Sequence, residues 1–173
     1  MRGQVCNNTG YAGELTIKLN SNNNTVLYRV MNEGHKPLWN AIARVFAGDD
    51  VKKYIPKYIL VVEQEGSNPV MAGPVPINGA VWGDLVEKSD TSTSVLYKAT
   101  VTAADKIRSC TDDERLTIQL LNSDSSTDSQ RKNVMASITH EDIGKAWNTL
   151  KPGVDIILEW KLTFSNKDKE VQM

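Results

Sequence analysis

Val154-Asp-Ile-Ile-Leu-Glu-Trp-Lys-Leu-Thr-Phe-Ser165 is the stretch that decides the fold of this chain. Its even-numbered positions are all apolar, and its odd-numbered positions are polar except for Ile157. Alternation at a period of two is typical of a half-buried β-strand, because successive side chains point to opposite faces of a sheet. The stretch therefore predicts a long strand with one face in the core, where we expect Trp160.

Seven further segments are predicted to be strands; all carry the same alternation or a short apolar run except 77–86, whose apolar residues follow no clean period. They are 14–19, 25–31, 58–64, 77–86, 95–101, 116–120 and 134–138, with 58–64 as a central strand. Between them, 66–76 and 122–130 are rich in Gly, Asn, Pro or Ser and predict loops, while the charged segment 105–115 is expected to hold a helical turn.

Two short helices are predicted, in 37–47 and 139–150, because apolar residues recur there at helical spacing. Pro37 near the start and Gly48 just past the end of the first segment fit the usual asymmetry of helix ends. The pattern places three tryptophans on apolar faces, and all three are expected in the core: Trp39, Trp147 and Trp160.

This order of elements favours a mainly β fold over a doubly wound α/β fold, because the helices do not alternate regularly with the strands. The chain has 173 residues, enough for one core. We expect a single β-rich domain over 1–173 with short flexible termini. Its architecture is predicted to be a β-sandwich or a partly closed barrel of seven or eight strands with two short helices.

Composition narrows the classes of partner. The net charge of -1 argues against a nucleic-acid-binding protein, which usually carries a clustered basic excess. No apolar run is long enough for a membrane span, and the first residues lack the apolar core of a signal peptide. Cys6 and Cys110 are too few and too far apart for a disulfide scaffold or a four-ligand zinc site. Whether they pair stays open. We expect neither a nucleic-acid nor a membrane partner.

Catalytic motifs are missing from the sequence. The only histidines, His35 and His140, lie in no recognisable context, and the chain has no nucleophile elbow, phosphate-binding loop, dinucleotide fingerprint or zinc-protease motif. We therefore predict no catalytic, cofactor-binding or metal-binding residues, no cofactor, and a protein that is not an enzyme.

Two groups of acidic residues leave two other functions open, a glycosidase site and a calcium site. A paired-carboxylate glycosidase needs no local motif, and its acids would come from Asp49-Asp50 and Asp112-Asp113-Glu114. Both clusters lie at segment boundaries, where adjacent acids are usually solvated. Asp124 and Asp128 could bind calcium through clustered oxygen atoms, but their segment lacks the Gly and the terminal Glu of an EF-hand loop.

Trp82 and Tyr97 suggest an alternative function, the binding of a carbohydrate or a receptor. Trp82 lies between glycines, and no periodicity assigns it to a core face. The two residues are the candidate stacking side chains of a carbohydrate- or receptor-binding β-sandwich module.

One long segment resembles a known class of proteins. Asn32-Glu-Gly-His-Lys-Pro-Leu-Trp-Asn-Ala-Ile-Ala-Arg-Val-Phe-Ala-Gly-Asp-Asp, followed by Ile55-Pro-Lys-Tyr-Ile, is similar to small virion proteins of tailed bacteriophages, as is the C-terminal order of helix, Pro-Gly and long Trp-containing strand. The resemblance covers about a third of the chain and assigns no functional residues.

The resemblance and the missing catalytic motifs together imply a non-enzymatic structural component of a phage virion. The expected position is a capsid auxiliary, head-tail junction or tail protein, assembled in the host cytoplasm. It would act through protein-protein contacts with other virion proteins and with copies of itself, since a long strand with an unpaired edge must be capped, twisted away or shared.

Overall fold

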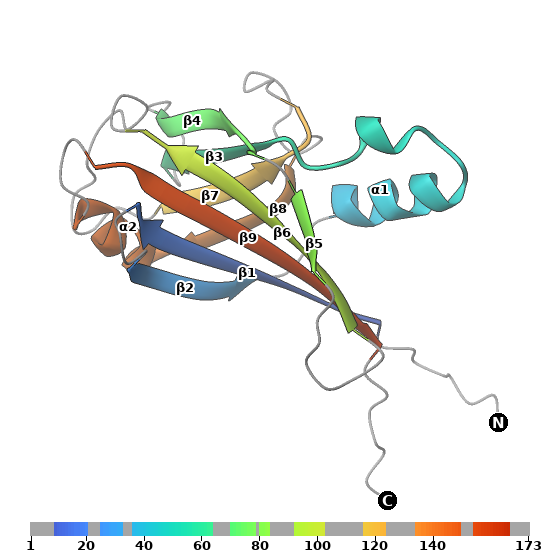
Figure 1. The fold of residues 1–173 in the computed structure, drawn as a ribbon, viewed down its shortest axis with the longest axis horizontal. Coiled ribbons are helices and arrows are strands. Elements are labelled where there is room, and N and C mark those ends of the chain that lie inside the picture. The colour runs from blue at the N-terminus through green and yellow to red at the C-terminus, as the bar shows by residue number, and fades with distance from the viewer. Residues whose placement is uncertain are drawn as a thin grey trace, which may run out of the picture.

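The computed structural model describes residues 9–20, 25–32, 36–63, 70–78, 80–83, 92–102, 116–123, 134–149 and 154–166. These residues form two antiparallel sheets that do not close into a barrel. Sheet A has the order β2 (Val26–Asn32), β1 (Thr9–Leu19), β9 (Ile156–Asn166), β6 (Ser92–Val101) and β5 (Ala80–Gly83). Sheet B has the order β4 (Val70–Pro76), β3 (Tyr58–Glu63), β7 (Leu116–Leu121) and β8 (Val134–His140). Figure 1 shows the two sheets as layers, which confirms the predicted mainly β sandwich.

Strand β9 is the middle strand of sheet A and pairs with β1 and β6 along nearly its whole length. Ile156, Leu158, Trp160 and Leu162 have almost no accessible surface, so the alternation identified the buried face correctly. Ile157 lies in register with Thr100 on the other face, where it is half-buried. The expected burial of Trp160 is thereby confirmed.

One hydrophobic core lies between the sheets. Sheet A contributes Leu15, Ile17, Tyr97 and Leu158, and sheet B contributes Ile59, Val61, Ile118 and Ala136, all within a single cluster of buried side chains. The predicted central strand, β3, does lie inside its sheet, between β4 and β7.

The two helices lie at opposite ends of the sandwich (Figure 1). Helix α2 (Glu141–Asn148) contacts β7, β2 and β8 and buries Ile143 and Trp147 completely. Helix α1 (Lys36–Phe46) contacts β8 and the short 3-10 helix η1 (Val51–Lys53), and it projects from the sheets. Its buried residues are Leu38 and Ala41.

The prediction of a loop at 66–76 was wrong for 70–76, which forms β4; the described residues thus hold nine strands, one more than the eight predicted segments. Gly and Pro mark loops in most contexts, but Pro is tolerated on edge strands, and β4 is an edge strand. Gly73 has a φ of 95°, and the register shifts beside it. This irregularity explains why the segment shows no alternation in its sequence.

The prediction of a buried Trp39 was also wrong, because 43% of its surface is exposed. Periodicity identifies an apolar face but not the width of the surface that covers it. Among the described elements, α1 makes its main contacts with β8 and η1; Leu38 and Ala41 are buried, and the face that carries Trp39 stays partly open. Three segments with predictions lie outside the described residues: 105–115, residues 124–130 of the predicted loop, and 167–173 at the end of the chain.

Candidate functional site

Exposed apolar side chains gather on the unit formed by α1 and η1. Six large apolar side chains in the described part of the chain are exposed, and only Val26 lies elsewhere. Single exposed apolar residues are normal, whereas a cluster of them marks an interaction surface. We call the cluster the apolar ridge; it consists of Trp39, Val45, Phe46, Val51 and Ile55.

Phe46 is the most prominent member of the ridge, with 87% of its surface exposed. It occupies the end of α1, where Gly48 adopts a φ of 89°. The Gly48 N–H donates to the Val45 carbonyl and the Asp49 N–H to the Arg44 carbonyl, each at 3.0 Å. This is the hydrogen-bond pattern of a Schellman motif, and it fixes the backbone that carries Phe46.

A triangle of polar side chains holds the turn after α1. The Arg44 guanidinium lies 3.2 Å from both the Asp49 carboxylate and the Tyr54 hydroxyl, and the Tyr54 hydroxyl donates to Asp49 over 3.3 Å. The hydrogen bonds that Arg44 donates, first to Tyr54 and then to Asp49, raise the pKa of Arg44. The Asp50 carboxylate accepts from the Lys52 N–H and caps η1. Both members of the Asp49-Asp50 cluster therefore have structural partners.

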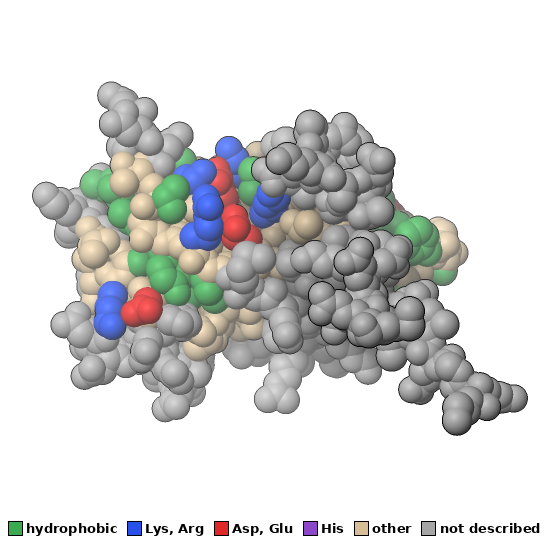
Figure 2. Space-filling model, turned by 90° about the horizontal axis from the view of Figure 1, so that it is seen from below, with side chains coloured by type: hydrophobic (Ala, Val, Ile, Leu, Met, Phe, Trp, Pro, Cys, Tyr) green, Lys and Arg blue, Asp and Glu red, His purple; other side chains and the backbone are tan. Residues whose placement is uncertain are grey.

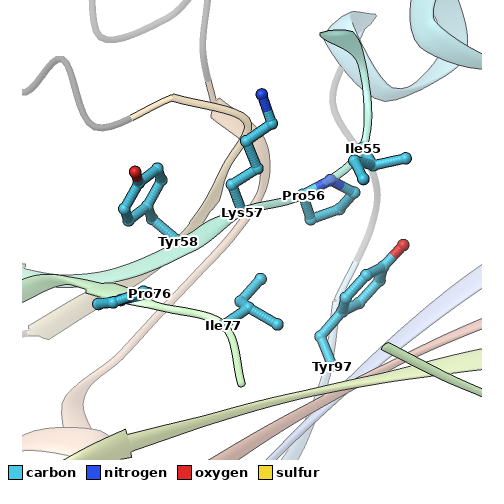
Figure 3. A pocket seen from close by; sticks show the side chains of 7 residues that line it. All are labelled: Ile55, Pro56, Lys57, Tyr58, Pro76, Ile77 and Tyr97. Atoms are coloured by element: carbon cyan, nitrogen blue, oxygen red, sulfur yellow. The ribbon is translucent and has the colours of Figure 1, made fainter. Parts of the chain in front are cut away.

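Next to the ridge lies a hollow of about 410 Å³. In Figure 3, Ile77 and Tyr97 extend toward Ile55 and Pro56, whereas the Lys57 ammonium points away from the space between them. Tyr97 comes from sheet A, Tyr58 and Pro76 come from sheet B, and the other walls come from the segment before β3 and from Ile77, directly after β4. The hollow is lined by Ile55, Pro56, Lys57, Tyr58, Pro76, Ile77 and Tyr97.

Backbone hydrogen bonds hold the walls of the hollow. The Lys57 N–H donates to Leu121 at 2.7 Å, and its carbonyl accepts from the Ile77 N–H at 2.8 Å. The next residue, Asn78, donates to the Lys98 carbonyl on β6 at 2.7 Å. The segment 77–78 therefore links the two sheets, and the hollow is formed before any ligand enters. Ile55 belongs to both the ridge and the hollow, so the two features are continuous.

Tyr97 is the polar group in the floor of the hollow. Only 8% of its surface is exposed, and burial raises the pKa of its phenol to about 12. Desolvation disfavours the phenolate, so the side chain stays neutral at physiological pH. The hollow therefore offers mainly apolar walls and the neutral hydroxyl of Tyr97, which suits an apolar or aromatic guest.

The two predicted stacking residues lie on neighbouring strands. Trp82 is opposite Val95 in the register of β5 and β6, and Ala80 is opposite Tyr97. Trp82 and Tyr97 are therefore diagonal neighbours along the backbone, two positions apart. The side chain of Trp82 lies outside the described residues. The structure therefore shows that the backbone positions of Trp82 and Tyr97 are close, and says nothing of a contact between their side chains.

Other residues singled out from the sequence form no site in the described part of the chain. Several of them lie outside the described residues: His35, the acidic cluster 112–114, Asp124 and Asp128. The side chain of His140 also lies outside the described part. The described residues contain no group of three or more His, Cys, Asp or Glu placed to hold a metal ion. Neither described helix has the length and apolarity that crossing a membrane requires.

The outer face of sheet A carries a network of charges. Glu159 on β9 bonds both Lys18 on β1 and Lys98 on β6, the second at 3.2 Å. Burial alone would raise the pKa of Glu159, but the hydrogen bonds and charges of the two lysines outweigh it and lower that pKa. Basic and acidic side chains lie next to one another in the space-filling view, not in separate patches of one sign (Figure 2). The two ion pairs of Glu159 therefore tie β9 to β1 and to β6 on this face.

Sequence reasoning missed the ridge and most of the hollow. Phe46 carries a weak signal, since an aromatic residue directly before Ala-Gly at a helix end has few neighbours to cover it. The hollow has no local signal, because its residues come from three segments, 55–58, 76–77 and 97. Comparison of the chain with known protein families, curated proteins and solved structures gave no match.

Proposed function

We propose that this protein is a non-enzymatic structural component of a tailed-phage virion that acts through protein-protein contacts made by the apolar ridge. The observation that carries the proposal is the exposure of Trp39, Val45, Phe46, Val51 and Ile55 on one projecting unit. Aromatic residues dominate the binding energy of protein interfaces, and two of the five are aromatic. Covering them with a partner would remove their apolar surface from water, which is the main driving force of association.

The virion setting rests on the sequence resemblance. The similar segment runs through residues 32–50 and 55–59, and it therefore contains four of the five ridge residues. The same segment supplies Ile55, Pro56, Lys57 and Tyr58 to the hollow. A capsid auxiliary, head-tail junction or tail protein would use such a surface repeatedly, once per copy, against other virion proteins.

Attachment to particles tests the proposal. Particles assembled without the chain are mixed with the purified protein and sedimented, and we expect the protein to sediment with them. Phe46→Ser should abolish this attachment, because it removes the most exposed ridge side chain without touching the core. Val26→Ser is the matched control, since Val26 is exposed but lies outside the ridge. A folded wild-type protein that stays in the supernatant would contradict the proposal.

The alternative, a carbohydrate- or receptor-binding module with Trp82 and Tyr97 as stacking residues, stays a prediction. A stacking platform presents the face of a ring, whereas Tyr97 exposes only 8% of its surface, inside the hollow. Absence of binding on a glycan array at high protein concentration would eliminate this alternative.

A further inference from the structure

We infer that the ridge binds an amphipathic helix of its partner, whose apolar stripe is bordered by Asp and Glu side chains. The inference deepens the proposed function and rests on it, because it states the chemistry of the partner's contact surface. Two observations carry it: an apolar stripe on the exposed side of α1, and a border of positively charged side chains beside the ridge.

The stripe consists of Trp39, Ala43 and Phe46. These residues follow one another at intervals of four and three positions, so they lie on one face of α1, and all three are exposed. Leu38 and Ala41, which are buried, lie on the adjoining face. Apolar anchors at i, i+4 and i+7 are the spacing with which an amphipathic helix contacts a protein partner.

Ala43 gives the stripe a relief that suits a second helix. Its side chain is much smaller than those of Trp39 and Phe46 on either side, so the middle of the stripe is lower than its ends. Two helices pack by placing the side-chain rows of one between the rows of the other. A row of aliphatic side chains on the partner helix would cross the stripe at Ala43 and contact both rings.

Three lysines border the ridge. Lys52 and Lys53 lie in η1 and Lys57 follows it, and all three side chains are exposed. None of them forms an ion pair within the described part of the chain. Their charges are therefore available to a partner.

The two acids of the same unit do not cancel these charges. Asp49 is paired with Arg44, and Asp50 caps η1 by accepting from the Lys52 N–H. Segment 36–57 contains five Lys or Arg and two Asp or Glu, although the chain as a whole has a net charge of -1. The surface that complements the border of the ridge is therefore acidic.

Asp49 and Asp50 also favour a protein partner over an anionic lipid surface. Both are exposed, and they lie in the chain between the ridge residues Phe46 and Val51. A bilayer that took up these two apolar side chains would draw both carboxylates to a negatively charged surface, which repels them. A helix is narrow enough to cover the stripe and leave the carboxylates in water.

A pair of synthetic peptides tests the inference. Both carry a fluorescent label and Leu at helical spacing, and their remaining positions combine Ala with Glu in one peptide and with Lys in the other. Fluorescence anisotropy with the full-length protein should show binding of the acidic peptide, and binding of the basic peptide at least about 10-fold weaker at low salt. The difference should shrink as salt screens the charges. Equal affinities, or a preference for the basic peptide, would overturn the inference.

Variants locate the contact. Lys53→Glu should weaken binding of the acidic peptide about 3-fold, and the double reversal Lys52→Glu/Lys53→Glu about 10-fold or more. Lys145→Glu makes the same change of charge on α2, at the opposite end of the sandwich, and should leave the affinity unchanged. Phe46→Ser should abolish binding. These four side chains are exposed, so the variants should fold. A double reversal that binds as tightly as wild type would contradict the inference.

Vesicles of phosphatidylcholine and phosphatidylglycerol separate a helix from a lipid surface. The protein should stay in the supernatant when these vesicles are sedimented. Sedimentation with the vesicles that both Phe46→Ser and the double reversal remove would assign the ridge to an anionic membrane surface, and the inference would be wrong.

The proposed function fails separately. Protein that attaches to virion particles through Phe46 but shows no preference for the acidic peptide would refute the inference and leave the proposed function standing. Protein that prefers the acidic peptide but never sediments with particles would do the reverse.

Discussion

Tyr97 lies directly opposite Trp160 in the register of β6 and β9, and both side chains belong to the core between the sheets. Trp160 has no accessible surface, whereas Tyr97 lines the hollow. The floor of the candidate site is therefore part of the packing that stabilises sheet A. A substitution at Tyr97 therefore affects the hollow and the core together, whereas one at Trp160 affects the core.

Trp160→Ala should lower the free energy of unfolding by about 3–5 kcal/mol, because it leaves a cavity at a fully buried position. Trp39→Ala is the matched control, since the same substitution at a side chain 43% exposed should cost less than about 1 kcal/mol. Urea unfolding followed by fluorescence or circular dichroism measures both. A loss below about 1 kcal/mol for Trp160→Ala would show that this face meets solvent or a partner and not the core.

Gly73→Ala should destabilise the protein more than Gly48→Ala. Both glycines have positive φ, which costs an alanine about 1–2 kcal/mol. At Gly73 an added Cβ would also lie 2.7 Å from the Val75 nitrogen and 2.8 Å from the Ile59 carbonyl oxygen, whereas at Gly48 it would meet nothing within 4 Å. Thermal unfolding of the two variants compares the costs. Equal losses would mean that β4 can shift away from β3 without penalty.

Three strands of sheet A could be predicted with their buried faces because each carries its own side-chain period, whereas the segment of β5 has no clean period. In β1, β6 and β9 the alternation in the sequence matches the buried face. Strand β4 could not be predicted in this way, since Gly73 and Pro74 are compatible with a strand only at a sheet edge, and edge position is a property of the assembled sheet.

The candidate site was less predictable than the fold. Trp39 shows why: helical periodicity placed it on an apolar face, but among the described elements α1 makes its main contacts with β8 and η1, and 43% of the Trp39 surface stays exposed. Tyr97 was named as a candidate ligand-binding residue, yet its burial in the floor of a hollow depends on Ile55 and Ile77, which the sheets bring to it. Contacts between distant segments leave no spacing pattern in the sequence.

Glu159→Gln should lower stability at neutral pH by about 1–3 kcal/mol, because it removes a charged acceptor shared by Lys18 and Lys98. The lysines lower the pKa of Glu159 in the folded state below its ordinary value of 4.5. Its contribution is therefore present above pH 4.5 and is lost as pH falls through the folded pKa. Wild type and variant should converge in stability in acid, as urea unfolding at pH values from neutral downward would reveal.

Glu14→Gln is the control for this prediction. Glu14 pairs with Arg29 at 3.6 Å on the same sheet, but the Arg29 side chain is largely exposed. Exposed ion pairs contribute about 0–1 kcal/mol, so this variant should differ little from wild type at any pH. A Glu159→Gln variant with a pH profile parallel to that of wild type would contradict the role assigned to the two lysines.

Tyr97→Phe should remove a loss of stability that the wild type shows in alkali. Burial raises the pKa of Tyr97 from 10.0 to about 12, whereas the unfolded chain ionises at the ordinary value. Between these pH values the unfolded state releases the proton first, so stability falls as pH rises, by about 2–3 kcal/mol in total. Phe lacks the proton and should keep the same apolar contacts. Urea unfolding at a series of pH values from 9 to 12 compares the two chains, and a variant that loses as much stability as wild type would mean that the Tyr97 hydroxyl is open to water in the hollow.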